Sequence, residues 1–224
     1  GPDLMNNMME QAEKFGTDIR YEDVVKLELA GEVKRVHLED EVLETRTVIF
    51  STGSAYRKLG LEEEDKYSGH GVSYCATCDG FFFRDQDIIV VGGGDSAMEE
   101  ATFLTTFAKS VTVVHRRDEL RASAAMAKRA LENPKINFAW NSRVSALHGE
   151  GALESVTLTD TVTGQTRELA ATGLFVAIGS TPRSELVRDQ LELDAAGYVV
   201  VSHPSTRTNV PGVFACGDVA DPTY

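Results

Sequence analysis

The sequence predicts an α/β protein with two domains, each built around buried parallel strands. Asp87–Val91 predicts a buried strand, apolar from Ile88 onward, that leads through Gly92–Gly94 into a helical pattern and then into an apolar run, Val111–Val114. This order is that of a compact βαβ unit. Thr47–Phe50 and Gly173–Gly179 are further apolar runs, of the kind found in strands buried on both faces. Each of these two runs follows a stretch in which apolar and polar residues alternate, as in a β-meander. The same order of meander and buried strand thus occurs twice, which indicates two similar domains.

The first part of the chain predicts one helix and a set of antiparallel strands. Asp3 caps a helix that Gly16 ends, and the helix carries apolar residues, several of them Met, at helical spacing. We expect this Met cluster to pack in a core. Alternating runs over 24–29 and 33–38 predict an antiparallel meander. The acidic run 62–66 is typical of a solvated connector.

The later part predicts two helices, a second meander and a final strand. The helices are expected over 96–109 and 121–131, and the strands of the meander over 136–140, 144–147, 153–159 and 167–170. Phe81–Phe83 and Trp140 are expected to fill a core or a domain interface. Gly212–Val219 predicts a short apolar strand, with Cys216 as a small buried residue inside it.

Composition narrows the classes of function. The chain has 224 residues and a net charge of −13, which argues against a general binder of nucleic acid or anionic membrane. No apolar run approaches the roughly 18 residues that a membrane helix needs, and no signal peptide opens the chain. Three cysteines do not make a secreted disulfide framework. We therefore expect a cytoplasmic protein, and the abrupt ends suggest a piece of a longer one.

Cys75 and Cys78 are the strongest chemical signal in the sequence. Two cysteines at this spacing can close a disulfide, or keep one thiolate near neutral pH when reduced. Asp79 follows directly and could pass a proton. The alternative is half of a zinc site, but a closed zinc site needs four ligands, and the remaining cysteine, Cys216, is distant in sequence. Redox chemistry is therefore favoured over metal binding.

The segment after the strand 87–91 carries a dinucleotide-binding pattern. Gly92, Gly94 and Ala97 form G-x-G-x-x-A at a strand-to-helix turn, with Asp95 and Ser96 between them. The pattern alone is weak. Here strand, glycines, helix and second strand stand in the required order, which favours a dinucleotide site over a structural turn.

The residues that end the second strand indicate which dinucleotide is bound. An NAD site carries an acid about 20 residues on, to hold the ribose 2′-hydroxyl. This chain instead has His115, Arg116 and Arg117, and Arg121 four residues later. A cationic cluster suits a 2′-phosphate, because guanidinium groups bind phosphate oxygens. The sequence therefore predicts NADPH.

Small residues at the ends of the other buried strands complete the candidate sites. Thr52 and Gly53 end one strand, and Ile178 and Gly179 end another, where a backbone can approach a ligand closely. Gly217 and Asp218 end the last strand, where a carboxylate can reach a sugar or ribityl hydroxyl. We count these residues as cofactor-binding candidates.

Taken together, four segments resemble the low-molecular-weight NADPH-dependent thioredoxin reductases, in the order found in that family. They are Cys75–Gly80, Gly92–Ala97, His115–Arg117 and Gly212–Val219. The resemblance implies electron transfer from NADPH to FAD, to the Cys75–Cys78 disulfide and then to thioredoxin. It further implies that Cys78 faces the flavin, that Cys75 attacks thioredoxin, and that Asp79 supplies the proton.

The resemblance also implies a domain arrangement. Two Rossmann-like three-layer domains with β-meanders are expected, an NADPH domain at 58–184 inserted into an FAD domain at 1–57 and 185–224. The family begins with its own G-x-G-x-x-G unit for FAD and continues past the Gly-Asp strand. This sequence contains neither part, so we expect an incomplete FAD site. In that family the NADPH domain rotates relative to the FAD domain, and residues 62–67 and the region near Arg183 are the candidate hinges. A homodimer is expected in the full-length enzyme.

Three alternatives remain open at this point. One is the flavoprotein subunit of a peroxide-reducing system, which shares both motifs. Another is an inactive NADPH-binding fragment, and the third is a zinc-bound interaction domain.

Overall fold

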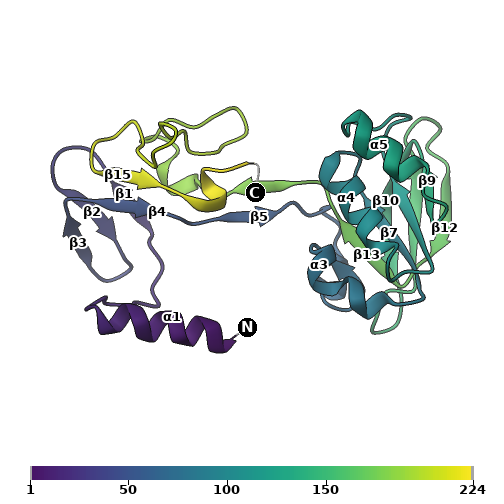
Figure 1. Ribbon diagram of the computed structural model, residues 1–224, viewed down its shortest axis with the longest axis horizontal. Coiled ribbons are helices and arrows are strands. Elements are labelled where there is room, and N and C mark those ends of the chain that lie inside the picture. The colour runs from purple at the N-terminus through teal and green to yellow at the C-terminus, as the bar shows by residue number, and fades with distance from the viewer. Residues whose placement is uncertain (1, 223–224) are drawn as a thin grey trace. The chain divides into compact units, whose positions relative to one another are not determined.

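The computed structural model describes residues 2–222 of the chain. The chain forms two compact units, one of residues 1–54 and 182–224 and one of residues 55–181. It leaves the first unit along β5 (Ser54–Tyr56) and returns along β14 (Ser180–Pro182), and these two strands pair with each other (Figure 1). The hinge predicted at 62–67 was wrong, since that segment lies inside the second unit.

The second unit is built on a five-stranded parallel sheet with the order β6-β13-β7-β8-β9. The strands are β6 (Val72–Ser73), β7 (Asp87–Val91), β8 (Ser110–Val114), β9 (Ile136–Ala139) and β13 (Gly173–Val176). The prediction that 136–140 belongs to the meander is wrong, because residues 136–139 form the edge strand of the parallel sheet. β9 pairs in parallel with β8. Ile136 of β9 packs in the core on one face of the sheet and Ala139 in the core on the other face, as expected for a strand of a sheet covered on both sides.

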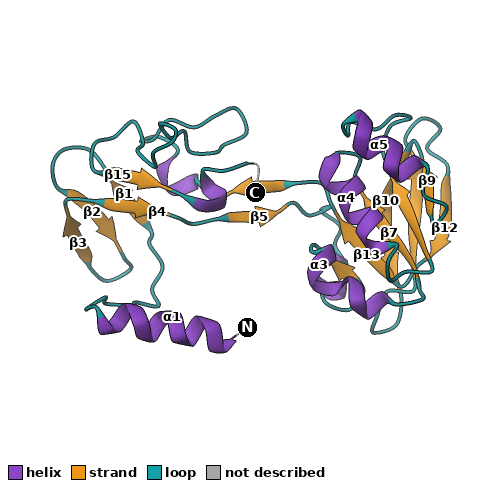
Figure 2. Ribbon diagram, viewed as in Figure 1, coloured by secondary structure: helices purple, strands orange, loops and turns teal. Residues whose placement is uncertain are grey.

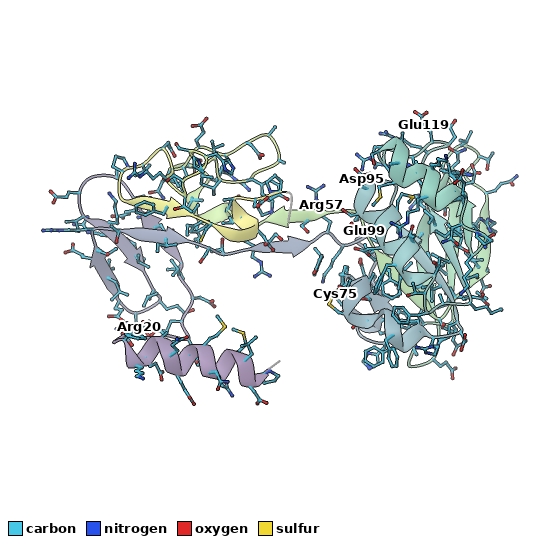
Figure 3. The ribbon with its side chains drawn as sticks, viewed as in Figure 1. Arg20, Arg57, Cys75, Asp95, Glu99 and Glu119 are labelled. Carbon is cyan, nitrogen blue, oxygen red and sulfur yellow. A yellow bond between two sulfur atoms is a disulfide. The ribbon has the colours of Figure 1, made fainter. Side chains whose placement is uncertain are left out.

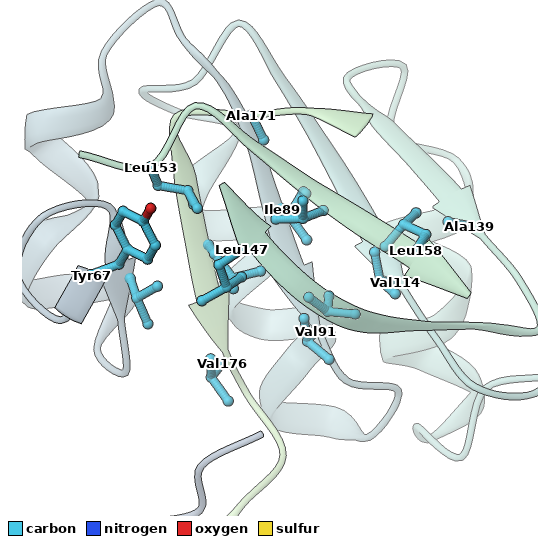
Figure 4. Close-up of a cluster of buried hydrophobic side chains, with 14 residues drawn as sticks. Tyr67, Ile89, Val91, Val114, Ala139, Leu147, Leu153, Leu158, Ala171 and Val176 are labelled. Atoms are coloured by element: carbon cyan, nitrogen blue, oxygen red, sulfur yellow. The ribbon is translucent and has the colours of Figure 1, made fainter. Parts of the chain in front are cut away.

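Helices cover one face of this sheet and a meander covers the other (Figure 2). The helices are α4 (Asp95–Leu104) and α5 (Ala124–Leu131), and the antiparallel strands are β10 (Ser142–His148), β11 (Ser155–Asp160) and β12 (Thr166–Ala170). Ile88 and Val90 pack among the side chains of the helices, whereas Ile89 and Val91 pack against the meander (Figure 4). Because neighbouring residues of a strand point to opposite faces, a strand buried on both faces must be apolar throughout.

Short elements complete the second unit. They are α2 (Glu64–Tyr67), α3 (Ala76–Asp79) and the 3₁₀ turn η1 (Gly80–Phe83). Phe81 and Phe82 do not fill a core as expected, since both rings are mostly exposed. They contact each other edge to face, and Arg84 lies over the Phe81 ring.

The first unit contains the predicted meander and one parallel strand pair. The meander is β1 (Lys26–Glu28), β2 (Lys34–His37) and β3 (Val42–Thr45), and the pair is β4 (Val48–Phe50) with β15 (Val213–Ala215). The 3₁₀ turns η2 (Glu185–Val187) and η3 (Gly217–Val219) lie in the returning segment. The core of this unit gathers around Leu29, Phe50 and Val213.

The N-terminal helix forms as predicted but does not pack as predicted. It is α1 (Pro2–Lys14), and none of its residues is buried. Leu4, Met5 and Met8 are all more than half exposed, so the expectation of core packing was wrong for this chain. The helical periodicity was read correctly, but a pattern along one helix does not supply the surface against which it packs.

Glu100 on α4 provides a test of the packing of the second unit. Its Oε2 is buried without a hydrogen-bond partner, and burial, with a smaller contribution from Glu99, raises the pKa of its carboxyl group to about 7. The folded state then holds a proton that the unfolded state has lost, so stability falls as the pH rises from about 4.5 to 7. We expect Glu100→Gln to stabilise the protein at pH 8 by on the order of 1 kcal/mol, after allowing for solvent screening.

Urea unfolding at pH 5 and pH 8 measures this effect. Glu192→Gln, at an exposed position, serves as the matched control and should not change the free energy of unfolding at either pH. Equal stabilisation by Glu100→Gln at both pH values would contradict the assignment.

Candidate active site

The two cysteines form a disulfide at the start of α3. Cys75 is joined to Cys78, and Cys75 immediately precedes the helix (Figure 3). The Cys78 backbone N–H lies 3.2 Å from Cys75 Sγ, and Thr77 Oγ1 lies 3.4 Å from the same sulfur.

Asp79 closes the same loop. Ser73, at the end of β6, donates its hydroxyl proton to Asp79 Oδ2 at 2.6 Å. The same hydroxyl oxygen accepts the Cys75 backbone N–H at 3.1 Å. The three residues predicted to be catalytic thus lie in one short segment, and Ser73 links its two ends. Ser73 is not predictable from the sequence, because a serine beside a CxxC motif is not a distinctive pattern.

Glu64 is a second residue that the sequence analysis misjudged. It was counted in a solvated connector, yet its side chain is 1% exposed. Its carboxylate accepts the backbone N–H groups of Leu59 and Gly60, both at 2.9 Å, and the Tyr74 hydroxyl at 2.8 Å. The Tyr74 ring also stacks on Tyr56, with 5.9 Å between ring centroids. Burial first, and then Glu64, raises the pKa of Tyr74. The network ties the residue before Cys75 to the segment that follows β5.

The three glycines after β7 have different surroundings. A Cβ on Gly92 would lie 2.4 Å from the Ala177 carbonyl oxygen and 2.6 Å from Ala97 Cβ. A Cβ on Gly93 would lie 2.2 Å from His115 Cε1, whereas one on Gly94 would meet nothing within 4 Å. Two glycines therefore allow close packing within the protein. The third leaves open space at the N-terminus of α4, where a pyrophosphate could approach the backbone.

Some of the residues around the turn Gly92–Gly94 are buried against the protein, and others are exposed to solvent. Asp95 Oδ1 accepts the Ser123 backbone N–H at 2.7 Å and so connects α4 to the start of α5. Ala97 is fully buried, and Ser96 is exposed. The His115 ring is buried beneath Gly93, and its Nε2 has no hydrogen-bond partner. Burial lowers the pKa of His115, so the ring is neutral and does not add a cation.

The arginines behave differently from His115. Arg116, Arg117 and Arg121 are exposed and follow the C-terminal end of β8, the strand beside β7. None of the three is in an ion pair with a carboxylate of the described residues. Ile178 and Gly179 follow β13, the other neighbour of β7. The sheet order thus brings these predicted residues to one edge, where ligands bind in open α/β sheets. The open turn and the three free guanidinium groups fit NADPH.

The first unit gathers the remaining candidates. β4 and β15 are parallel neighbours, so Thr52 and Gly53 adjoin Gly217 and Asp218 at their C-terminal ends. Ser54 Oγ lies 3.3 Å from Asp218 Oδ2, and a Cβ on either glycine would meet nothing within 4 Å. This open, hydroxyl- and carboxylate-lined edge fits a flavin nucleotide. The sequence analysis placed Cys216 inside the strand and buried, but it follows β15 and is half-buried.

We also searched the described residues for a metal site and for a helix that could cross a membrane. Residues 2–222 contain no group of three or more His, Cys, Asp or Glu side chains that could hold a metal ion. Within the same residues, no helix has the length and apolar character that crossing a membrane requires.

Comparisons with known proteins agree with this geometry. Residues 3–224 match the family described as pyridine nucleotide-disulphide oxidoreductase. The chain is 63% identical over its whole length to a thioredoxin reductase of Streptomyces clavuligerus and spans 70% of that protein. It is 51% identical to a bifunctional thioredoxin reductase/thioredoxin of Mycobacterium leprae, of which it spans 49%.

A solved structure supports the same assignment. The thioredoxin reductase of Streptococcus pyogenes is 46% identical, with a TM-score of 0.80 over 98% of this chain and 72% of the other. The resemblance expected from the four motifs is therefore confirmed. The chain belongs to the pyridine nucleotide-disulphide oxidoreductase family and, within it, to the thioredoxin reductases.

Proposed function

We propose that this chain carries the NADPH-binding domain and the redox-active dithiol of a thioredoxin-disulfide reductase, which passes electrons from NADPH through FAD and Cys75–Cys78 to thioredoxin. One observation carries the proposal. The disulfide and the open glycine turn with its free arginines are built into the same compact unit.

The residues of this chain would hold the two cofactors in different units. Gly94, with Arg116, Arg117 and Arg121, would bind the pyrophosphate and 2′-phosphate of NADPH. Gly53, Gly217 and Asp218 would contact FAD. When bound, these cofactors supply hydride transfer and carry the electrons to the disulfide.

The dithiol would then reduce thioredoxin. Cys75 would attack the thioredoxin disulfide, and Cys78 would complete the exchange. Asp79 would take up and return the protons. Thioredoxin has a reduction potential of about −270 mV, and NADPH is a stronger donor, so the direction is favourable.

We further propose that residues 58–184 form the NADPH domain, inserted between FAD-domain segments at 1–57 and 185–224. The open edge that each unit presents supports this division of roles. We propose that the full-length enzyme is a cytoplasmic homodimer, on the basis of the family resemblance and the sparse cysteine content.

The function is tested by following NADPH oxidation in the presence of oxidised thioredoxin, after recording the visible spectrum of the purified protein. We expect a flavin absorption band and thioredoxin-dependent turnover from a protein that binds FAD. A protein that is colourless, binds NADPH and still fails to turn over after addition of FAD would instead be an inactive NADPH-binding fragment.

Arg116→Ala tests the choice of cofactor. Removing this guanidinium should weaken NADPH binding by about 1.5–3 kcal/mol, the usual contribution of a charged hydrogen bond, and should leave NADH binding nearly unchanged. Titration calorimetry with both nucleotides measures the difference. Arg129→Ala, at an exposed position on α5, is the control. Equal losses for NADPH and NADH would contradict the assignment of a 2′-phosphate site.

A further inference from the structure

We propose that Ser73 is a positioning residue for the redox-active pair, acting through Asp79. The inference deepens the proposed function and rests on it. Ser73 is buried, and its hydroxyl makes the shortest polar contact of the loop, the 2.6 Å hydrogen bond to Asp79 Oδ2. The single hydroxyl proton is directed to that carboxylate, since the alternative acceptor, the Cys75 carbonyl oxygen, is 3.3 Å away.

The hydroxyl is held in place from the other side as well. Its oxygen accepts the Cys75 backbone N–H at 3.1 Å, so the order of donation is Cys75 N–H to Ser73, and Ser73 O–H to Asp79. The Asp79 backbone N–H in turn donates to the Cys75 carbonyl oxygen at 3.1 Å. The start and the end of the Cys75–Asp79 segment are therefore connected both through the backbone and through Ser73.

The sheet supplies the fixed reference for this arrangement. Ser73 is the last residue of β6, and it lies in register with Phe175 of β13, which is fully buried. A carboxylate on a short surface helix would otherwise sample several rotamers. The bond to Ser73 fixes Oδ2, and no donor among the described residues contacts Oδ1. Oδ1 is thus the oxygen left to exchange a proton with a cysteine sulfur.

The step that Ser73 would support balances as follows for reduction of the disulfide by a small dithiol. One reductant sulfur attacks a protein sulfur, the Cys75–Cys78 bond breaks, and a mixed disulfide forms. The second reductant sulfur then attacks the reductant sulfur of the mixed disulfide and displaces the protein cysteine that is still bonded to it. Two electrons pass to the pair, the reductant becomes a disulfide, and Asp79 transfers protons from the reductant thiols to the cysteine sulfurs as they leave.

The test measures the rate at which dithiothreitol reduces this pair, without NADPH or flavin. Iodoacetamide quenching followed by mass spectrometry reads the state, since the free Cys216 gives one modification in the oxidised chain and three in the reduced chain. We expect Ser73→Ala to slow reduction about tenfold. Ser73→Thr, which keeps the hydroxyl, should restore most of the rate.

Two further variants show whether Ser73 acts through Asp79. Asp79→Asn should slow reduction of the disulfide at least as much as Ser73→Ala does. When Ser73→Ala is added to Asp79→Asn, the rate of reduction should not fall further. Ser155→Ala is the matched control, because Ser155 is also a buried serine that donates to a carboxylate, that of Glu168, outside this loop. It should leave the rate unchanged.

The outcomes separate the two proposals. If Asp79→Asn slows reduction and Ser73→Ala does not, the role of Ser73 is overturned while that of Asp79 stands. If the two substitutions are additive, Ser73 acts through the loop in general and the inference fails. If Asp79→Asn has no effect, the assignment of Asp79 in the proposed function fails, and the inference fails with it.

Discussion

In the full-length enzyme, we expect Cys78→Ser to abolish the NADPH-dependent reduction of thioredoxin, whereas NADPH should still be oxidised with an artificial acceptor such as ferricyanide. Without the second sulfur, the Cys75–Cys78 disulfide cannot form, and the remaining Cys75 thiol holds only one of the two electrons that thioredoxin requires. The glycine turn and the arginines are unchanged, so NADPH binding and the delivery of electrons to the acceptor persist. The two assays are run on the same preparation.

Cys216→Ser is the matched control for this prediction. Cys216 is a free cysteine, and it lies in the other unit. Its replacement should leave both activities close to those of the unsubstituted enzyme. Thioredoxin turnover that survives Cys78→Ser would refute a relay through the dithiol.

We expect Gly93→Ala to destabilise the protein and to weaken NADPH binding. The added Cβ would lie 2.2 Å from a ring atom of the buried His115, so the turn or the ring must move. We expect a loss of about 1–3 kcal/mol in the free energy of unfolding, the usual cost of overpacking. We also expect an NADPH affinity lower by at least about tenfold, because the turn that approaches the pyrophosphate is displaced. Urea unfolding and calorimetric titration measure the two effects.

Two comparisons isolate the cause. Gly94→Ala meets no protein atom within 4 Å, so it should weaken NADPH binding without lowering stability. In a His115→Ala background, Gly93→Ala should lower the free energy of unfolding only slightly, because the ring that the added Cβ would overlap is absent. An equal cost of Gly93→Ala in both backgrounds would show that the close approach to His115 is not the reason.

The candidate site was predictable where its chemistry is local in sequence. Cys75 and Cys78 are close enough along the chain to pair, and the order of strand, glycines and helix determines where α4 begins. Arg116 and Arg117 follow β8 directly, so their place at the sheet edge depends only on that strand having been recognised. The comparisons confirm the family resemblance drawn from these segments, and the roles of the individual residues stay predictions.

The burial and charge of a side chain were predicted wrongly where they depend on partners that are distant in sequence. Glu64 lies in an acidic run, which predicts exposure, but it is buried because Leu59, Gly60 and Tyr74 direct three donors at its carboxylate. His115 stands beside two arginines and was grouped with them as a cation. Its ring is instead neutral and packed beneath Gly93.

The sequence by itself therefore determined the class of fold, the redox pair and the cationic cluster, because each depends on residue types at short, fixed spacings. Only the tertiary structure decided that β9 joins the parallel sheet, that Ser73 connects Cys75 to Asp79, and that two glycines of the turn serve packing and one faces open space. These features depend on which segments the folded sheet brings together. Side-chain burial and hydrogen bonding follow from that assembly, not from the pattern of any one segment.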